Sequence, residues 1–239
     1  MEFANVRKKI KIKKMIIPQI LTELKKNSDT KNIEQMARFG IFPKKTFGVK
    51  MPILRKLAKK IGKNHDLAQD LWKKGFRETQ ILASIIDEPE KVTLKQIKNW
   101  ISDFDYWEIC DQCVMNLFEK IPFIWDECIN FANDEREFFR RTGFVIMARL
   151  AVSDKKASDK KFIAFFPLIK KFSTDERNMV KKAVNWALRQ IGKRNLALHK
   201  EALKIAQEIS QINNKTAKWI SSDAIRELKN EKIISRIKK

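Results

Sequence analysis

The chain has 239 residues, 44% of them hydrophobic, which is enough to bury the core of one large globular domain. It contains no run of about 18 apolar residues, so the sequence predicts no membrane-spanning helix and no membrane partner. Its 51 Lys and Arg against 29 Asp and Glu give a formal net charge of +22, which indicates a polyanionic partner, above all nucleic acid. The codon bias of an AT-rich genome is the alternative source of this charge.

Residues 1–14 open the chain with six Lys or Arg and one Glu, a pattern that predicts a flexible basic arm or the start of a helix. Neither the apolar segment nor the cleavage site of a secretory signal is present. We therefore expect a cytoplasmic, nucleoid-associated protein. A single domain over residues 1–239 is expected, because no change in composition marks a linker.

Apolar residues recur at helical spacing along most of the chain, so we predict an all-α fold of short helices. Pro18 and Pro52 lie where first turns are expected, and Gly40, Gly62 and Gly75 follow last turns. In the first half, helices are predicted over 17–27, 32–39, 52–61, 66–74, 77–86 and, capped by Thr93, 94–101. The longest loop, 40–50, is basic and aromatic and is well placed to face a ligand.

The second half predicts longer helices and contains most of the candidate site residues. Arg140 and Arg141 are embedded in an apolar helix, and Trp186 lies in a strongly basic one. Pro167 is expected to interrupt its helix. These helices are predicted over 106–120, 122–132, 137–152, 162–172, 178–192, 197–212 and 216–229, followed by a final short helix.

The predicted helices form antiparallel pairs, and the second helix of several pairs opens with a similar polar–aromatic segment. These openings lie roughly 30–40 residues apart, the period of a HEAT-like solenoid. In such a stack the second helices line one concave surface, so residues at the same depth become neighbours. Trp107, Asp111, Arg141 and Trp186 all fall on that layer. The sequence therefore predicts an α–α superhelix with a basic concave face.

Trp107 and Asp111 lie four residues apart, on one face of the predicted helix 106–120. From spacing alone, core packing of the indole and solvation or capping by the carboxylate is the better interpretation. Arg141 and Trp186 change this balance, because the repeat brings them to the same layer. Their own alternatives are a salt bridge between repeats for Arg141 with Asp111 and core packing for Trp186.

Three cysteines occur, and two of them, Cys110 and Cys113, form a C-x-x-C inside the predicted helix 106–120. No other Cys or His lies near them in sequence, and a redox motif would require a strand–helix context. We expect buried thiols and neither a metal site nor a cofactor.

Six segments stand in a specific order between about residue 33 and residue 235. They are Met36-Ala-Arg-Phe-Gly40, Phe47-Gly-Val-Lys-Met-Pro-Ile-Leu-Arg55, Ala83-Ser-Ile-Ile-Asp-Glu-Pro-Glu90, Asp103-Phe-Asp-Tyr-Trp-Glu-Ile-Cys-Asp111, Phe139-Arg-Arg-Thr-Gly-Phe144 and Lys182-Ala-Val-Asn-Trp-Ala-Leu-Arg189. In these segments the chain resembles the DNA alkylation repair family of HEAT-like-repeat DNA glycosylases, the AlkD-like proteins.

The resemblance implies roles for individual residues. It places the central tryptophan on Trp107 and the catalytic carboxylate on Asp111. It places a DNA-contacting arginine on Arg141, with Arg140 as the alternative register, and a second site tryptophan on Trp186. An aromatic site residue that is often Tyr falls on Phe39, which keeps the ring face and loses the hydroxyl. Basic residues of the Trp186 helix, including Lys182 and Arg189, are expected to bind phosphate.

The resemblance further implies a monomer that excises cationic N3- and N7-alkylated purines from double-stranded DNA. Indole faces can stabilise such a cationic base, and Asp111 can stabilise the oxocarbenium-like sugar and position water. A HEAT-repeat protein that binds damaged, bent or branched DNA without catalysis is the main alternative. A protein–protein scaffold is disfavoured by the net charge and by the Trp/Asp/Arg/Trp set.

Overall fold

The structure is a computed structural model that describes residues 15–237, and every regular element in this range is helical. The predicted basic arm, residues 1–14, lies outside the described residues. The α-helices are α1 (Ile17–Lys26), α2 (Thr30–Arg38), α3 (Met51–Ile61), α4 (His65–Trp72), α5 (Arg77–Ile86), α6 (Leu94–Ser102), α7 (Trp107–Asn116), α8 (Ile124–Asn133), α9 (Glu137–Ser153), α10 (Asp159–Ile163), α11 (Phe166–Lys171), α12 (Asn178–Gly192), α13 (Leu196–Ser210), α14 (Lys215–Leu228) and α15 (Glu231–Ile237). Short 3₁₀ helices occupy Pro89–Lys91, Phe118–Lys120 and Phe172–Thr174.

Side-chain caps explain why several helices begin where they do. The Asn64 side chain accepts a hydrogen bond from the backbone N–H of Leu67, at 3.0 Å, and starts α4. Thr93 accepts from the N–H of Gln96 at 3.2 Å, so its predicted role as the cap of α6 is confirmed. Gly62 ends α3 with a φ of 78°, a left-handed value that favours glycine.

Two predicted helices are divided in the structure. The predicted helix 106–120 ends as α7 at Asn116, because Leu117 leaves the helical conformation with φ −131° and ψ −61°. This turn buries both Leu117 and Phe118 completely. The predicted helix 162–172 is interrupted as expected: α10 and α11 are separate, and Pro167 lies in the first turn of α11.

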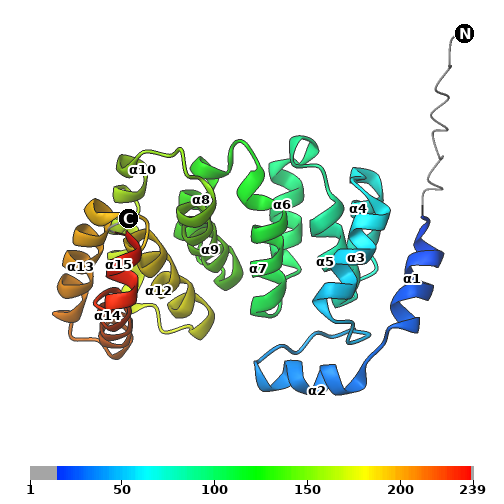
Figure 1. The fold of residues 1–239 in the computed structure, drawn as a ribbon, viewed down its shortest axis with the longest axis horizontal. Coiled ribbons are helices and arrows are strands. Elements are labelled where there is room, and N and C mark those ends of the chain that lie inside the picture. Colours follow the sequence, from blue (N-terminus) through cyan, green and yellow to red (C-terminus); the bar gives the residue numbers. More distant parts are fainter. Residues whose placement is uncertain (1–14, 238–239) are drawn as a thin grey trace, which may run out of the picture.

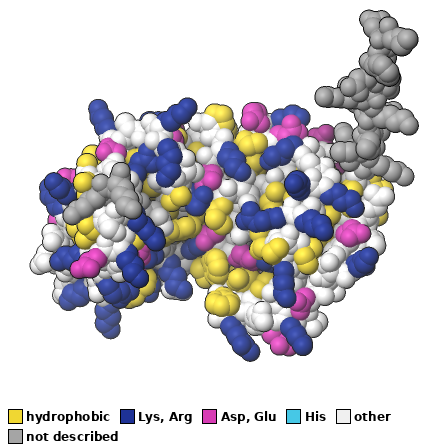
Figure 2. Space-filling model, viewed as in Figure 1, with side chains coloured by type: hydrophobic (Ala, Val, Ile, Leu, Met, Phe, Trp, Pro, Cys, Tyr) yellow, Lys and Arg dark blue, Asp and Glu magenta, His cyan; other side chains and the backbone are white. Residues whose placement is uncertain are grey.

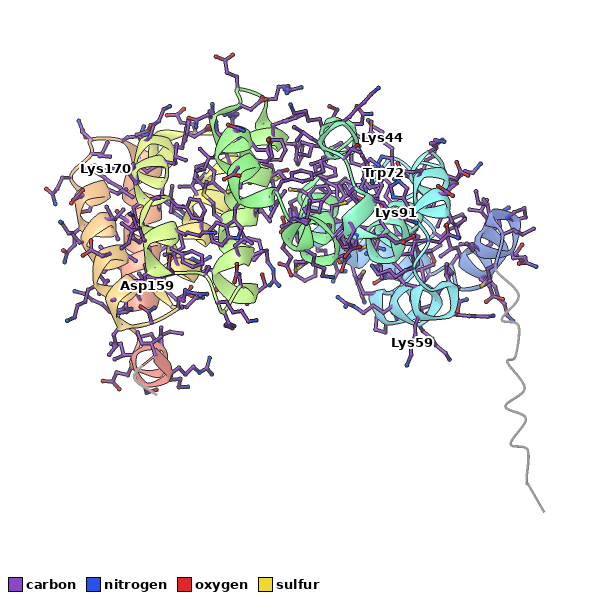
Figure 3. All side chains as sticks on the ribbon, turned by 90° about the horizontal axis from the view of Figure 1, so that it is seen from above. Lys44, Lys59, Trp72, Lys91, Asp159 and Lys170 are labelled. Atoms are coloured by element: carbon purple, nitrogen blue, oxygen red, sulfur yellow. The ribbon has the colours of Figure 1, made fainter. Side chains whose placement is uncertain are left out.

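The helices form a right-to-left stack of antiparallel pairs, as predicted (Figure 1). The second helices α3, α5, α7, α9, α12 and α14 each pack against the next, and α4, α6, α8 and α13 lie on the other side. Helix α2 departs from the pattern by lying across one end of the helices near α3 and α5 (Figure 1). Side chains fill the space between the helices along the stack (Figure 3).

Basic side chains are distributed widely over the visible face of the molecule (Figure 2). On the face seen in Figure 2, Lys and Arg side chains are scattered among hydrophobic, acidic and other residues and do not gather into one patch. Among residues 15–237, no helix is both long and apolar enough to cross a membrane. No cluster of His, Cys, Asp and Glu suited to a metal ion occurs in the same range.

Gly143 marks the closest approach between α8 and α9. A Cβ atom at this position would lie 2.4 Å from the Ala132 nitrogen and 2.6 Å from the Cys128 carbonyl oxygen, both of which are backbone atoms. Neither helix can relieve such a clash by rotating a side chain. The small residue therefore sets the spacing within this helix pair.

We expect Gly143→Ala to lower the free energy of unfolding by about 1–3 kcal/mol, because overpacking outweighs the higher helix propensity of alanine. Urea denaturation would measure the change. Ser153→Ala, at the exposed end of the same helix, is the control and should change stability by less than about 0.5 kcal/mol. Equal stability of the two variants would contradict the close-approach interpretation.

Candidate functional site

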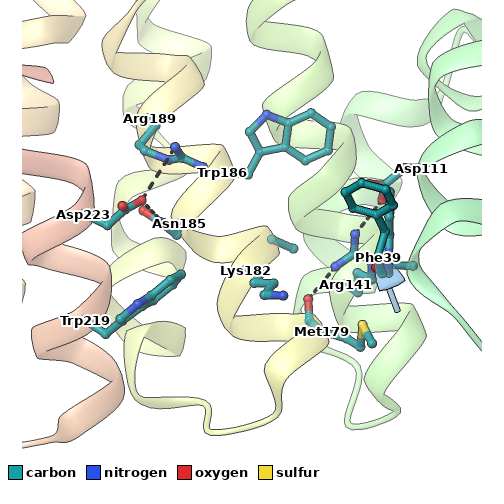
Figure 4. A pocket seen from close by; sticks show the side chains of 12 residues that line it. Phe39, Asp111, Arg141, Met179, Lys182, Asn185, Trp186, Arg189, Trp219 and Asp223 are labelled. Atoms are coloured by element: carbon teal, nitrogen blue, oxygen red, sulfur yellow. Dashed lines mark hydrogen bonds and ion pairs between the residues drawn. The ribbon is translucent and has the colours of Figure 1, made fainter. Parts of the chain in front are cut away.

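The second helices line a pocket of about 510 Å3 on the inner face of the stack (Figure 4). Residues from α7, α9, α12 and α14 meet there with Phe39, which directly follows α2, although they lie as far apart in sequence as residues 39 and 223. The pocket is lined by Phe39, Trp107, Asp111, Arg141, Met179, Lys182, Ala183, Asn185, Trp186, Arg189, Trp219 and Asp223. All the predicted site residues except Arg140 are among them.

Trp107 is the first residue of α7, and its half-buried indole joins two distant parts of the chain. Its Nε1–H donates a hydrogen bond to the Phe39 carbonyl oxygen at 2.9 Å. This bond brings the end of α2 to the pocket and leaves the Phe39 ring 73% exposed. Gly40 follows with a φ of 73°, a left-handed value that favours glycine.

Asp111 and Arg141 form a buried ion pair between α7 and α9. Arg141 Nη2 donates to Asp111 Oδ1 at 2.7 Å, and Arg141 Nη1 donates to the Met179 carbonyl oxygen of α12, also at 2.7 Å. Arg141 is 4% exposed and Asp111 is 9% exposed. Among the described residues, nothing donates a hydrogen bond to Asp111 Oδ2, so this oxygen stays available to a ligand in the pocket.

Two opposed effects act on the Asp111 carboxyl group. Burial raises its pKa, whereas the charge and hydrogen bond of Arg141 lower it, and burial is the larger effect. The pKa of Asp111 therefore lies above the ordinary value of 3.8. Arg141 reduces this rise because its guanidinium carries a permanent positive charge.

Both candidate arginines of α9 form hydrogen bonds with other groups of the protein. Arg141 has its terminal nitrogens on Asp111 and on a carbonyl group, which favours a positioning role; its contact with DNA stays a prediction. Arg140 lies outside the pocket lining: its Nη1 donates to Asp175 Oδ2 at 2.8 Å and its guanidinium stacks on Phe172 at 4.2 Å. The alternative assignment, in which Arg140 is the DNA-contacting arginine, therefore puts that residue outside the pocket.

Helix α12 contributes Trp186, Lys182 and Arg189 to the pocket. Trp186 is half-buried, so its ring both packs against the core and borders the pocket. Lys182 is exposed and pairs with no carboxylate among the described residues. Arg189 is paired with Glu227 and lies 3.6 Å from Asp223 Oδ2, so it is less free to bind phosphate.

Five further residues that were not predicted as site residues also line the pocket: Met179, Ala183, Asn185, Trp219 and Asp223. Trp219 and Asp223 lie on α14, the second helix that follows α12, and they repeat the four-residue spacing of Trp107 and Asp111. This repeated spacing is the sequence pattern from which Trp219 and Asp223 could have been predicted.

A buried carboxylate holds the loop that precedes α3. Glu78 accepts hydrogen bonds from the backbone N–H groups of Phe47 at 3.0 Å and Val49 at 3.1 Å, and from Thr46 Oγ1 at 2.8 Å. Arg77 adds a bond to the Val49 carbonyl oxygen at 3.0 Å. The loop is thus attached to α5. Phe39, which directly precedes the loop in sequence, is the neighbouring pocket residue.

The three cysteines are fully buried free thiols, as predicted. Burial raises the pKa of Cys110 to about 12 and that of Cys113 well above 9.0. Neither thiol ionises near neutral pH, so neither can serve as a nucleophile.

Comparison with known proteins supports the predicted family and fold. A family model described as "DNA alkylation repair enzyme" matches residues 20–228. A solved structure from a new family of proteins related to the HEAT-like repeat DNA glycosylases, with affinity for branched DNA structures, superposes with a TM-score of 0.75 at 20% identity, covering 89% of this chain and 95% of that one. This likeness confirms the HEAT-like fold. A designed armadillo repeat protein in complex with a peptide aligns with a TM-score of only 0.36 at 13% identity, over 94% and 97% of the two chains. No curated protein matches the chain.

We expect Arg141→Met to lower the free energy of unfolding by about 3–5 kcal/mol near neutral pH, because it leaves Asp111 buried without its partner. Without Arg141 the pKa of Asp111 rises further, since burial is then unopposed. The loss should shrink as the pH falls toward 3.8, where a protonated carboxyl is tolerated. Urea denaturation at several pH values would measure it. Lys73→Met, which removes an exposed ion pair with Asp70, should change little.

Proposed function

The chain belongs to the DNA alkylation repair enzyme family, and from that premise we propose that it is a DNA glycosylase that releases N3- and N7-alkylated purines from double-stranded DNA. The observation that carries the proposal is the Asp111 carboxylate. One of its oxygens is held by Arg141, and the other borders an open pocket lined by the indoles of Trp107 and Trp186. The protein acts as a monomer beside the chromosome in the cytoplasm.

The substrate determines what chemistry the pocket must supply. An N3- or N7-alkylated purine carries a positive charge and is therefore a good leaving group. When the bond between C1′ and the base nitrogen breaks, its electron pair neutralises the base and the sugar becomes an oxocarbenium ion. Water then adds to C1′ and loses a proton. Stabilising positive charge and placing water matter more here than acid catalysis.

The pocket residues match these two needs. Each indole face in contact with the cationic base contributes about 0.5–2 kcal/mol of attraction. Asp111 Oδ2 stabilises the positive sugar and accepts a hydrogen bond from the attacking water, as a glycosidase carboxylate does. Arg141 holds Asp111 in place through Oδ1. The Phe39 ring contributes an exposed apolar surface at the edge of the pocket and offers no side-chain hydroxyl.

Binding to the DNA backbone rests on the basic residues around the pocket. Lys182 is the pocket cation that has no carboxylate partner among the described residues, so it is the first candidate to contact a phosphate. Arg189 can contact phosphate if it leaves Glu227 or Asp223. A net charge of +22 adds a long-range attraction that depends on salt.

A second candidate function is non-catalytic binding of damaged, bent or branched DNA. The observation that favours it is the burial of the Asp111–Arg141 pair, since an ion pair that joins two repeats needs no catalytic role. The structural relative with affinity for branched DNA has the same fold. This alternative predicts tight, salt-sensitive binding without release of a base.

Asp111→Asn tests the proposal. The amide keeps an oxygen for Arg141 but removes the charge that stabilises the sugar, so release of N7- and N3-alkylated bases from duplex DNA should fall at least about 100-fold. Free base would be measured by chromatography, and DNA affinity by fluorescence anisotropy, where little change is expected. Asp126→Asn, at an exposed position on α8, is the matched control and should release base normally. If the folded wild-type protein binds such DNA but releases no base above the spontaneous rate, the second function replaces the first.

The pH dependence of base release should report Asp111. Its ionised form is the active one, and burial raises its pKa above 3.8. The kcat/KM, which reflects ionisations of the free protein, should therefore fall with decreasing pH around a midpoint higher than 3.8. Spontaneous loss of base, measured without protein, is subtracted at each pH. A rate that stays constant down to pH 4 would argue against a carboxylate in the step.

A further inference from the structure

The pocket contains a second tryptophan–carboxylate pair, which the proposed reaction does not use. Trp219 and Asp223 lie four residues apart on α14, the spacing of Trp107 and Asp111 on α7. Both pairs line the same pocket, and Trp186 on α12 lies between Asp111 and Asp223 (Figure 4). The pocket therefore has an aromatic ring and a carboxylate at each end.

The carboxylate of this second pair retains acceptor capacity. Asp223 Oδ2 accepts a hydrogen bond from Asn185 Nδ2 at 2.7 Å and lies 3.6 Å from Arg189 Nη1, while Oδ1 accepts from Arg226. A carboxylate offers about four lone-pair positions, so these contacts do not exhaust it. The Asp223 side chain is 18% exposed, against 12% for Asp111, which makes it the more accessible of the two carboxylates.

Asn185 supplies a second acceptor beside Asp223. It is 1% exposed, it lines the pocket, and its Oδ1 has no hydrogen-bond partner. The orientation of its amide is determined by Asp223, because Nδ2 faces the carboxylate and the oxygen must face the other way. A buried acceptor without a partner costs free energy, so this atom points to a ligand that brings a donor.

Trp219 provides a surface on which a flat ligand can stack. It is 42% exposed, although large aromatic side chains are usually more buried. The Lys181 ammonium lies 5.0 Å from its ring centroid. An exposed indole with a cation beside it is the combination that binds one nucleotide, since the ring stacks on the base and the cation attracts its phosphate.

We propose that Trp219, Asp223 and Asn185 form a second subsite, which holds an unpaired nucleobase of the DNA. The base stacks on Trp219, and N–H groups on its pairing edge donate to Asp223 and to Asn185 Oδ1. Guanine fits best because its N1–H and N2–H donors are adjacent, whereas the single N–H of thymine stands between two carbonyl oxygens that the carboxylate repels. The inference rests on the proposed function, because the DNA must occupy the same pocket.

The test uses unalkylated DNA, so that no chemistry is required. Affinities are measured by fluorescence anisotropy at one salt concentration for a fully paired duplex, a duplex with one unpaired guanine and a duplex with one unpaired thymine. The wild-type protein should prefer the unpaired guanine. Trp219→Ala should reduce this preference about tenfold, because it removes one base-stacking contact, and Trp219→Phe should retain most of it. Leu196→Ala, on α13 outside the pocket lining and equally exposed at 43%, is the matched control.

Asp223→Asn provides the second arm, and it should weaken binding of the unpaired guanine more than that of the unpaired thymine. Comparing two bases within one variant cancels any effect on folding. The proposal is overturned if the wild-type protein shows no preference, if Trp219→Ala weakens all three duplexes equally or not at all, or if Asp223→Asn affects both bases alike. A protein that releases no alkylated base can still pass this test, and an active glycosylase can fail it.

Discussion

Buried ion pairs between consecutive second helices hold the stack in register. Arg77 of α5 donates to Glu108 of α7 at 2.6 and 2.7 Å, and Arg141 of α9 donates to Asp111 of α7 at 2.7 Å. Breaking such a pair is costly, because the remaining charge stays buried without compensation. The helices that carry the pocket can therefore shift relative to one another only by breaking these contacts.

The same pairing separates two electrostatic tasks. Inside the pocket the arginines form ion pairs with Asp111, Asp223 and Glu227. The aromatic rings and the remaining carboxylate oxygens are therefore the groups available to a ligand. Outside it, Lys and Arg are spread over the surface (Figure 2). The net charge of +22 attracts a polyanion at long range, whereas the pocket itself suits a cationic or donor-rich group. Both properties fit the proposed recognition of an alkylated base in DNA.

Most of the fold could be predicted because helices are encoded locally. Apolar spacing, a cap such as Thr93 and the glycines after last turns identified nearly every helix to within a few residues. The break at Leu117 was missed because it depends on burying Leu117 and Phe118 together, which is a tertiary effect. The orientation of α2 was also beyond the sequence, since its contacts join residues far apart in the chain, as in the Trp107–Phe39 and Asn32–Gly48 hydrogen bonds.

By itself the sequence determined the helix pairs, their period and the expected membership of Trp107, Asp111, Arg141 and Trp186 in one layer, because side-chain direction repeats with the helix. Only the tertiary structure decided how each layer residue is used, because burial and pairing depend on the neighbouring helix. It turned Arg141 inward, placed Arg140 away from the pocket, and added two residues of α14. Those last two had the right spacing, but spacing alone does not reveal which helix faces which.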